Sequence, residues 1–199
     1  MSTLSPAAMI RAVPEAAFVR VSDLPGTPAA ARKAASRASR DGDLVQIRKG
    51  LYYRGTRTRY GMTRPRLEEV VREVLGARGV GPSGYSAARV WGVTTQIPAT
   101  LEVSTLRSVD PLNGVKQVVR RNLARVDLNE KEIALLELLR APDIYVEAGW
   151  TVLLTKVRES LRTGEIRDEA LRTAVPGERN VTVRANFARL TNGLSLIAA

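Results

Sequence analysis

The chain has 199 residues, of which 44% are hydrophobic, and its 31 basic and 20 acidic residues give a formal net charge of +11. This apolar content is ordinary for a globular protein and excludes a fully disordered chain, while the length allows one large domain or two small ones. Cysteine and histidine are both missing, which excludes disulfides, thiolate chemistry and the side chain most used for acid–base catalysis at neutral pH.

Targeting signals are not evident in the sequence. No apolar run approaches the length of a transmembrane helix, and Arg11 and Glu15 interrupt the N-terminal segment, so we expect neither a membrane span nor a signal peptide. With no cysteine, the chain suits a reducing compartment, and we expect a cytoplasmic protein. No residue pattern indicates a catalytic site, a metal site or a cofactor, so we expect the protein not to be an enzyme.

The first predicted elements are short. Pro6 to Val13 has the apolar spacing of a helix. Ser22 to Leu24 is expected to form a second short helix or turn that is capped by Ser22. We expect Phe18 and Leu24 to belong to the core.

The next helix is predicted from Ala29 to Arg40. Thr27 is suited to cap its N-terminus, Pro28 suits the first helical position, and Gly42 is suited to end it. At about 100° per residue, the helix has two different faces. One face holds small residues, Ala31, Ala34, Ala35 and Ala38; the opposite face holds cations and one hydroxyl, Arg32, Lys33, Ser36, Arg37 and Arg40.

A basic hairpin is predicted directly after this helix. Leu44 to Ile47 and Leu51 to Arg54 have strand character, and Arg48-Lys49-Gly50 reads as the tight turn between them. A helix that is followed at once by a basic hairpin is the order of a winged helix-turn-helix. The tract from Arg54 to Arg66 is expected to be a linker.

Positive charge is concentrated in this region. Between Thr27 and Arg66 there are eleven basic and two acidic residues, a net charge of +9 out of +11 for the whole chain. Such a focused field predicts a nucleic-acid partner, with the helix in the major groove and the hairpin on phosphate or the adjacent minor groove. The predicted DNA-contacting residues are Arg32, Lys33, Ser36, Arg37, Arg40, Arg48, Lys49, Arg54, Arg57 and Arg59.

The rest of the chain predicts a mixed domain. A helix is expected from Pro65 to Arg78 and another from Tyr85 to Trp91, with strands at 100–105 and 115–121 that are expected to pair. The glycine-rich stretch between the two helices lacks the Gly-Lys-Ser/Thr ending of a phosphate-binding loop. A helix with a strong apolar core pattern, capped by Asn129, is expected at 130–140. Further helices are expected at 150–161 and 168–174, whereas 181–190 could be helix or strand. The acidic residues here are expected on helix surfaces or in first turns: Glu130, Glu132, Glu137, Glu165, Asp168 and Glu169.

These patterns predict an α/β (α+β) fold. We expect a winged helix-turn-helix domain with its basic linker at residues 1–62 and a mixed α/β domain at residues 63–199.

Two segments resemble a known family. The first is DGDLVQIRKGLYYRG, at 41–55, and the second is GPSGYSAARVWGVTTQIPATLEVST, at 81–105. Together they resemble the AbiEi-like antitoxins of bacterial type IV toxin–antitoxin pairs, over about residues 10 to 140. The matching residues are Arg48, Gly50, Leu51 and Tyr52 in the first segment, and Ser86, Ala87, Ala88, Trp91, Gly92 and Pro98 in the second.

The resemblance implies a function for each domain. It implies that the N-terminal domain binds inverted repeats of double-stranded DNA in its own promoter and represses it, with two copies on the DNA. It also implies that the C-terminal domain opposes a nucleotidyltransferase-like toxin encoded nearby, without a stable complex between the two proteins.

Other functions remain open at this point. One is a winged-helix transcription regulator whose second domain senses a ligand or dimerises. A second is an enzyme acting on nucleic acid, against which the missing histidine and cysteine argue. A third is a protein whose basic face binds RNA or an acidic protein.

Overall fold

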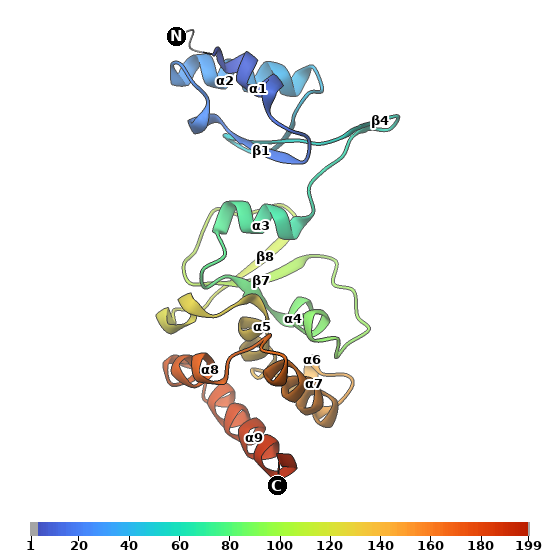
Figure 1. The fold of residues 1–199 in the computed structure, drawn as a ribbon, viewed down its shortest axis with the longest axis vertical. Coiled ribbons are helices and arrows are strands. Elements are labelled where there is room, and N and C mark those ends of the chain that lie inside the picture. Colours follow the sequence, from blue (N-terminus) through green and yellow to red (C-terminus); the bar gives the residue numbers. More distant parts are fainter. Residues whose placement is uncertain (1–3, 199) are drawn as a thin grey trace. The chain divides into compact units, whose positions relative to one another are not determined.

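The computed structural model describes residues 4–198 and divides into two compact units, Met1–Val74 and Leu75–Ala199. The division falls inside a helix, α3 (Leu67–Leu75), whereas the sequence indicated a boundary at 62/63. Helices and strands are both present, which confirms the predicted mixed α/β class (Figure 1). Among residues 4–198, no helix is both long and apolar enough to cross a membrane.

Unit 1 begins with a three-stranded sheet and its helices. The elements are α1 (Pro6–Ala12), β1 (Ala17–Arg20), a 3-10 turn η1 (Val21–Asp23), α2 (Pro28–Arg40), β2 (Val45–Arg48) and β3 (Leu51–Arg54). The strands are antiparallel, in the order β1-β3-β2, so β1 closes the sheet beside the β2–β3 hairpin. Helix, strand, short helix, helix and hairpin follow one another in the winged helix-turn-helix order. Ser22 lies inside η1 and does not cap it, contrary to expectation.

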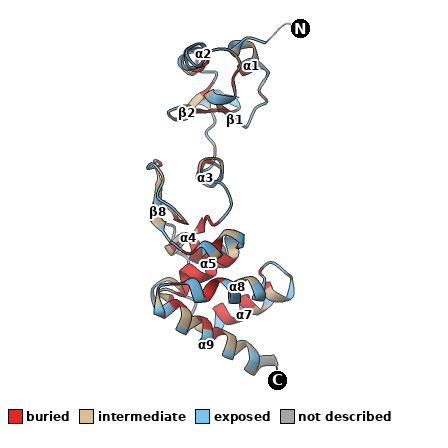
Figure 2. Cartoon of the chain, turned by 90° about the vertical axis from the view of Figure 1, so that its left-hand side faces the viewer, coloured by how far each residue is buried: buried red, intermediate tan, exposed pale blue. Residues whose placement is uncertain are grey.

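The core of unit 1 is small and depends on α2. Ala31 and Ala35 are 1% and 0% exposed and pack with Ile10 of α1, Val19 of β1 and Tyr52 of β3. Figure 2 shows buried residues, in red, over only short stretches of unit 1. Because alanine carries only one methyl group, α2 can lie close to its neighbours. The predicted alanine face is therefore the buried face.

The segment after β3 is not the linker that the sequence indicated. It contains a second hairpin of two short strands, β4 (Arg57–Thr58) and β5 (Gly61–Met62). Each strand is only two residues long and neither has an alternating apolar pattern, so strand periodicity gave no signal here. Hydrogen bonds that involve threonine side chains link the two strands of this hairpin.

Unit 2 contains a second three-stranded sheet. Its elements are β6 (Gly81–Pro82), α4 (Gly84–Trp91), β7 (Leu101–Thr105) and β8 (Val115–Val119). β7 lies in the middle, antiparallel to β6 and parallel to β8, with Leu101 opposite Val115. The two longer strands were predicted as partners, and this pairing is confirmed.

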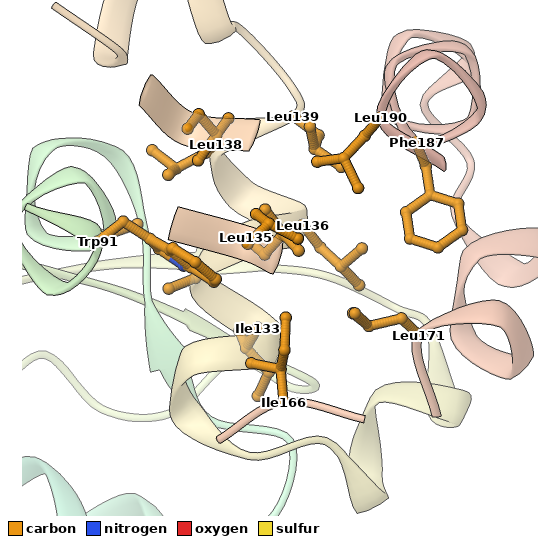
Figure 3. Packing of buried hydrophobic residues seen from close by; sticks show 14 of the residues in the cluster. Trp91, Ile133, Leu135, Leu136, Leu138, Leu139, Ile166, Leu171, Phe187 and Leu190 are labelled. Carbon is orange, nitrogen blue, oxygen red and sulfur yellow. The ribbon is translucent and has the colours of Figure 1, made fainter. Parts of the chain in front are cut away.

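The other helical elements of unit 2 are α5 and the helices that lie around it. They are η2 (Leu123–Asp127), α5 (Glu130–Leu138), α6 (Pro142–Tyr145), α7 (Trp150–Arg162), α8 (Asp168–Ala174), η3 (Val175–Gly177) and α9 (Val181–Ala198). The ambiguous segment at 181–190 is thus helical. Asn129 caps α5 through a reciprocal bond pair with Glu132. Figure 3 shows the leucines of α5 meeting Trp91, Leu171 and Leu190 from neighbouring elements.

Two acidic residues of α5 are buried. Glu132 lies in the first turn of the helix, as expected, whereas the expectation of a surface position for Glu137 is corrected. Glu132 is 0% and Glu137 is 2% exposed. Glu137 accepts hydrogen bonds from Arg125 at 2.7 Å and from Arg120 at 2.8 Å. Burial raises the pKa of Glu137, but the bond from Arg120 and the charge of Arg125 outweigh burial and hold its pKa below the ordinary value of 4.5. Residues 132–139 are all buried, so helical periodicity, which needs one exposed face, could not separate a buried acid from a surface acid here.

Candidate nucleic-acid interface

Helix α2 presents a cationic face to solvent. Thr27 caps its first turn by accepting a hydrogen bond from the Ala30 amide at 3.2 Å, and Pro28 occupies the first turn, as predicted. The residues predicted for the outer face are all exposed: Arg32, Lys33, Ser36, Arg37 and Arg40. The amphipathic pattern read from the sequence is therefore confirmed, with alanines inward and cations outward.

Two grooves flank this face. One, of about 570 Å³, lies between α2, η1 and the β2–β3 hairpin, and it is lined by Arg32, Ser36, Gln46 and Lys49 among others. The other, of about 300 Å³, lies between α1 and α2 and includes Lys33 and Arg37. The first groove brings α2 and the hairpin turn together on one surface, although eight residues, 41–48, lie between them in the sequence.

The hairpin turn is tighter than predicted. Only Lys49 and Gly50 connect β2 to β3, and Gly50 has φ +78°, a conformation that glycine adopts without strain. Arg48, expected in the turn, instead ends β2 and is half-buried. Lys49 is exposed at the tip. The turn therefore offers one fully solvated cation rather than two.

Arg54 does not join this surface. It is half-buried, and its Nη1 donates to the carbonyl oxygens of Ile10, Arg11 and Val13 at 3.3, 2.6 and 2.5 Å. These carbonyls lie at the C-terminal end of α1, where helical hydrogen bonds run out and a cation is favoured. Arg54 therefore links α1 to β3. Its role is structural, although it was predicted to contact DNA.

Arg57 and Arg59 lie on the second hairpin. Arg57 forms an ion pair with Asp43 at 2.9 Å, while Arg59 is at the tip of the β4–β5 hairpin. Beside Arg59 lies Tyr60, which is 85% exposed. Tyr60 and Gln46 were not among the DNA-contacting residues predicted from the sequence. An aromatic residue inside a run of cations was the signal that could have found Tyr60.

A polar depression of about 150 Å³ in unit 2 is lined by Lys116, Arg120, Arg140, Glu102 and Glu137 among others. Its cations are paired with carboxylates of the same depression. Lys116 bonds Glu102 at 2.6 Å, and Arg140 bonds Glu137 at 3.2 Å. Within residues 4–198, no group of histidine, cysteine, aspartate or glutamate side chains could hold a metal ion.

Comparison with known proteins gives little beyond the fold. No family model matches the chain, and no curated protein does. Among solved structures, the chain is similar to the RV2827C protein from Mycobacterium tuberculosis, with a TM-score of 0.50 and 17% sequence identity. The similarity covers 96% of this chain and 79% of that one. At this identity, the likeness is one of fold alone.

Proposed function

We propose that unit 1 is a DNA-binding winged helix-turn-helix, with α2 in the major groove and Lys49 on the phosphate backbone. The observation that carries this proposal is the exposed cationic face of α2 sharing a groove with the wing turn. Arginine and lysine on such a helix can reach guanine O6 and N7, while a cation on the wing neutralises phosphate. The revised set of contacting residues is Arg32, Lys33, Ser36, Arg37, Arg40, Lys49 and Arg59.

We further propose that the protein is the antitoxin of a type IV toxin–antitoxin pair that represses its own promoter in the cytoplasm. This step rests on the resemblance of residues 41–55 and 81–105 to the AbiEi-like antitoxins. One winged helix covers one half-site, so two copies would occupy an inverted repeat whose half-sites are spaced by whole helical turns. Within the unit 2 depression, Glu137 is bonded to Arg120 and its pKa is lowered, so this carboxylate is a poor general base.

Co-expression tests the antitoxin role. The full-length protein is expected to restore growth to cells that express a nucleotidyltransferase-like toxin encoded beside it, and to silence a reporter placed behind its own promoter. Repression without rescue would leave a winged-helix regulator that is not an antitoxin. Rescue without repression would separate the antitoxin role from unit 1.

Two single substitutions test the placement of helix and wing. Arg37→Ala is expected to cost about 1–3 kcal/mol on the preferred operator and to relax one base position, because a helix contact reads base edges. Lys49→Ala is expected to weaken all duplexes alike, because phosphate carries no sequence information. Binding constants for the operator and for random duplex measure both effects.

The control for this pair is Arg89→Ala, which removes an exposed cation from α4 in unit 2 and should leave both constants unchanged. Wild-type affinity of Arg37→Ala for operator and random DNA would show that α2 is not the reading helix.

A further inference from the structure

The hairpin at residues 56–63 is an ordered element that the winged helix does not require. The Thr56 amide donates to Thr63 Oγ1 at 2.9 Å, and the Thr63 amide donates to the Thr56 carbonyl at 3.0 Å. Nearer the tip, Thr58 Oγ1 donates to the Gly61 carbonyl at 2.8 Å. In Figure 1, the hairpin labelled β4 projects from the rest of unit 1. These bonds link the two strands of the hairpin, and residues 56–63 are not part of the core cluster of unit 1.

The tip presents an arginine and a tyrosine together. Tyr60 has the highest exposure, 85%, of the large hydrophobic side chains described in the chain. The Arg59 guanidinium lies over its ring, 4.6 Å from the centroid. The guanidinium covers one face of the ring, while the opposite face and the edge of the ring are exposed to solvent.

An ion pair anchors the base of this hairpin beside α2. Arg57 Nη2 lies 2.9 Å from Asp43 Oδ1 and donates to the Gly42 carbonyl at 3.4 Å. Gly42 and Asp43 follow directly on the C-terminus of α2. The second hairpin is thus tied to the end of the helix proposed to read DNA, and Arg57 is a positioning residue.

The positive charge of residues 44–67 indicates which class of partner the hairpin binds. No acidic residue occurs between Asp43 and Glu68, and Arg59 and Arg64 are both exposed in that stretch. A narrow ribbon with cations and one aromatic edge at its tip is complementary to the minor groove, whose negative potential draws in arginine where it is narrow.

We propose that the β4–β5 hairpin is a second DNA-binding element that inserts Arg59 and Tyr60 into the minor groove flanking the segment contacted by α2. The inference rests on the proposed function of unit 1 and extends it from two contacting elements to three. Arg59 contacts base edges or the groove walls, and Tyr60 fills the groove beside it. The contact lengthens the DNA site on one side of each half-site.

The experiment uses the full-length chain and a duplex that this chain selects from a random-sequence pool. Tyr60→Ala and Arg59→Ala are each expected to weaken binding about tenfold. Hydroxyl-radical footprinting should show that protection of one flanking minor groove disappears while protection over the α2 site persists. A minor-groove-binding drug should compete with the wild type but not with Tyr60→Ala.

Controls separate this inference from misfolding and from the proposed function. Tyr60→Phe retains the ring and should bind within about twofold of the wild type, and Arg89→Ala should leave the footprint unchanged. Wild-type affinity and an unchanged footprint for Tyr60→Ala would overturn the inference but leave the proposed function standing. Tighter binding to single-stranded RNA than to the duplex, lost in Tyr60→Ala, would also overturn it. Failure of the wild type to retain any duplex would overturn the proposed function itself.

Discussion

Replacing Glu137 with glutamine is expected to destabilise unit 2 by about 3–5 kcal/mol, because it removes the charge that compensates a buried cation. Arg125 is 0% exposed and is held between Glu137, at 2.7 Å, and Glu178, at 2.5 Å. Arg120 and Arg140 also bond Glu137. A neutral amide leaves Arg125 and Arg140 with Glu178 as their remaining buried acidic partner among residues 4–198.

Denaturant unfolding followed by tryptophan fluorescence measures this effect selectively. The chain has two tryptophans, and both Trp91 and Trp150 belong to unit 2. Glu159→Gln is the matched control, because Glu159 forms an exposed pair with Arg162 and its loss should leave the unfolding midpoint close to that of the wild type. Equal midpoints for the two variants would contradict a stabilising role for the buried charges.

The pH dependence of the difference provides a second check on Glu137. Its pKa is lowered in the folded state, so its contribution is complete above the unfolded value of about 4.3 and is lost as pH falls through the lowered folded value. The gap between wild type and Glu137→Gln should therefore be full at neutral pH and should shrink as pH falls below about 5.

DNA binding by the full-length protein is expected to weaken steeply with salt. If about five of the exposed cations of unit 1 meet phosphates, log K should fall against log salt with a slope of about −4.5, because each contact releases a counterion. Affinity would then drop by about 500-fold between roughly 50 and 200 mM salt. Titration by fluorescence anisotropy on the selected duplex measures the slope.

Single variants assign the slope to residues. Lys49→Ala should make it shallower by about one unit, since one phosphate contact is lost. Arg162→Ala removes an exposed cation of α7 in unit 2 and should not change it. A flat titration for the wild type would contradict the assignment of unit 1 to duplex DNA.

Local sequence patterns were sufficient to predict α2 and the wing. The cap at Thr27, Pro28 in the first turn and the alternation of alanine and cation every three to four residues fix the length and the inward face of α2. Each of these signals acts within one or two turns of the chain. Gly50 likewise predicted the position of the hairpin turn, because such a turn needs a residue with a positive φ.

Long-range contacts decided the features that the sequence analysis missed. Arg54 resembles every other cation of the basic tract, and only the packing of α1 against β3 brings the α1 carbonyls to its guanidinium. The β4–β5 hairpin has no strand periodicity and depends on threonine side chains that meet across the turn.

The buried charges of unit 2 show the same division. The run of apolar residues and the cap at Asn129 were enough to predict α5 as a strongly apolar helix. They did not determine that Glu137 would face Arg125, because residues from η2, α5 and the segment after η3 must meet to form that network. The tertiary structure decides whether a charged side chain has a partner when it is buried, and the desolvation of a charge can be compensated only by such a partner.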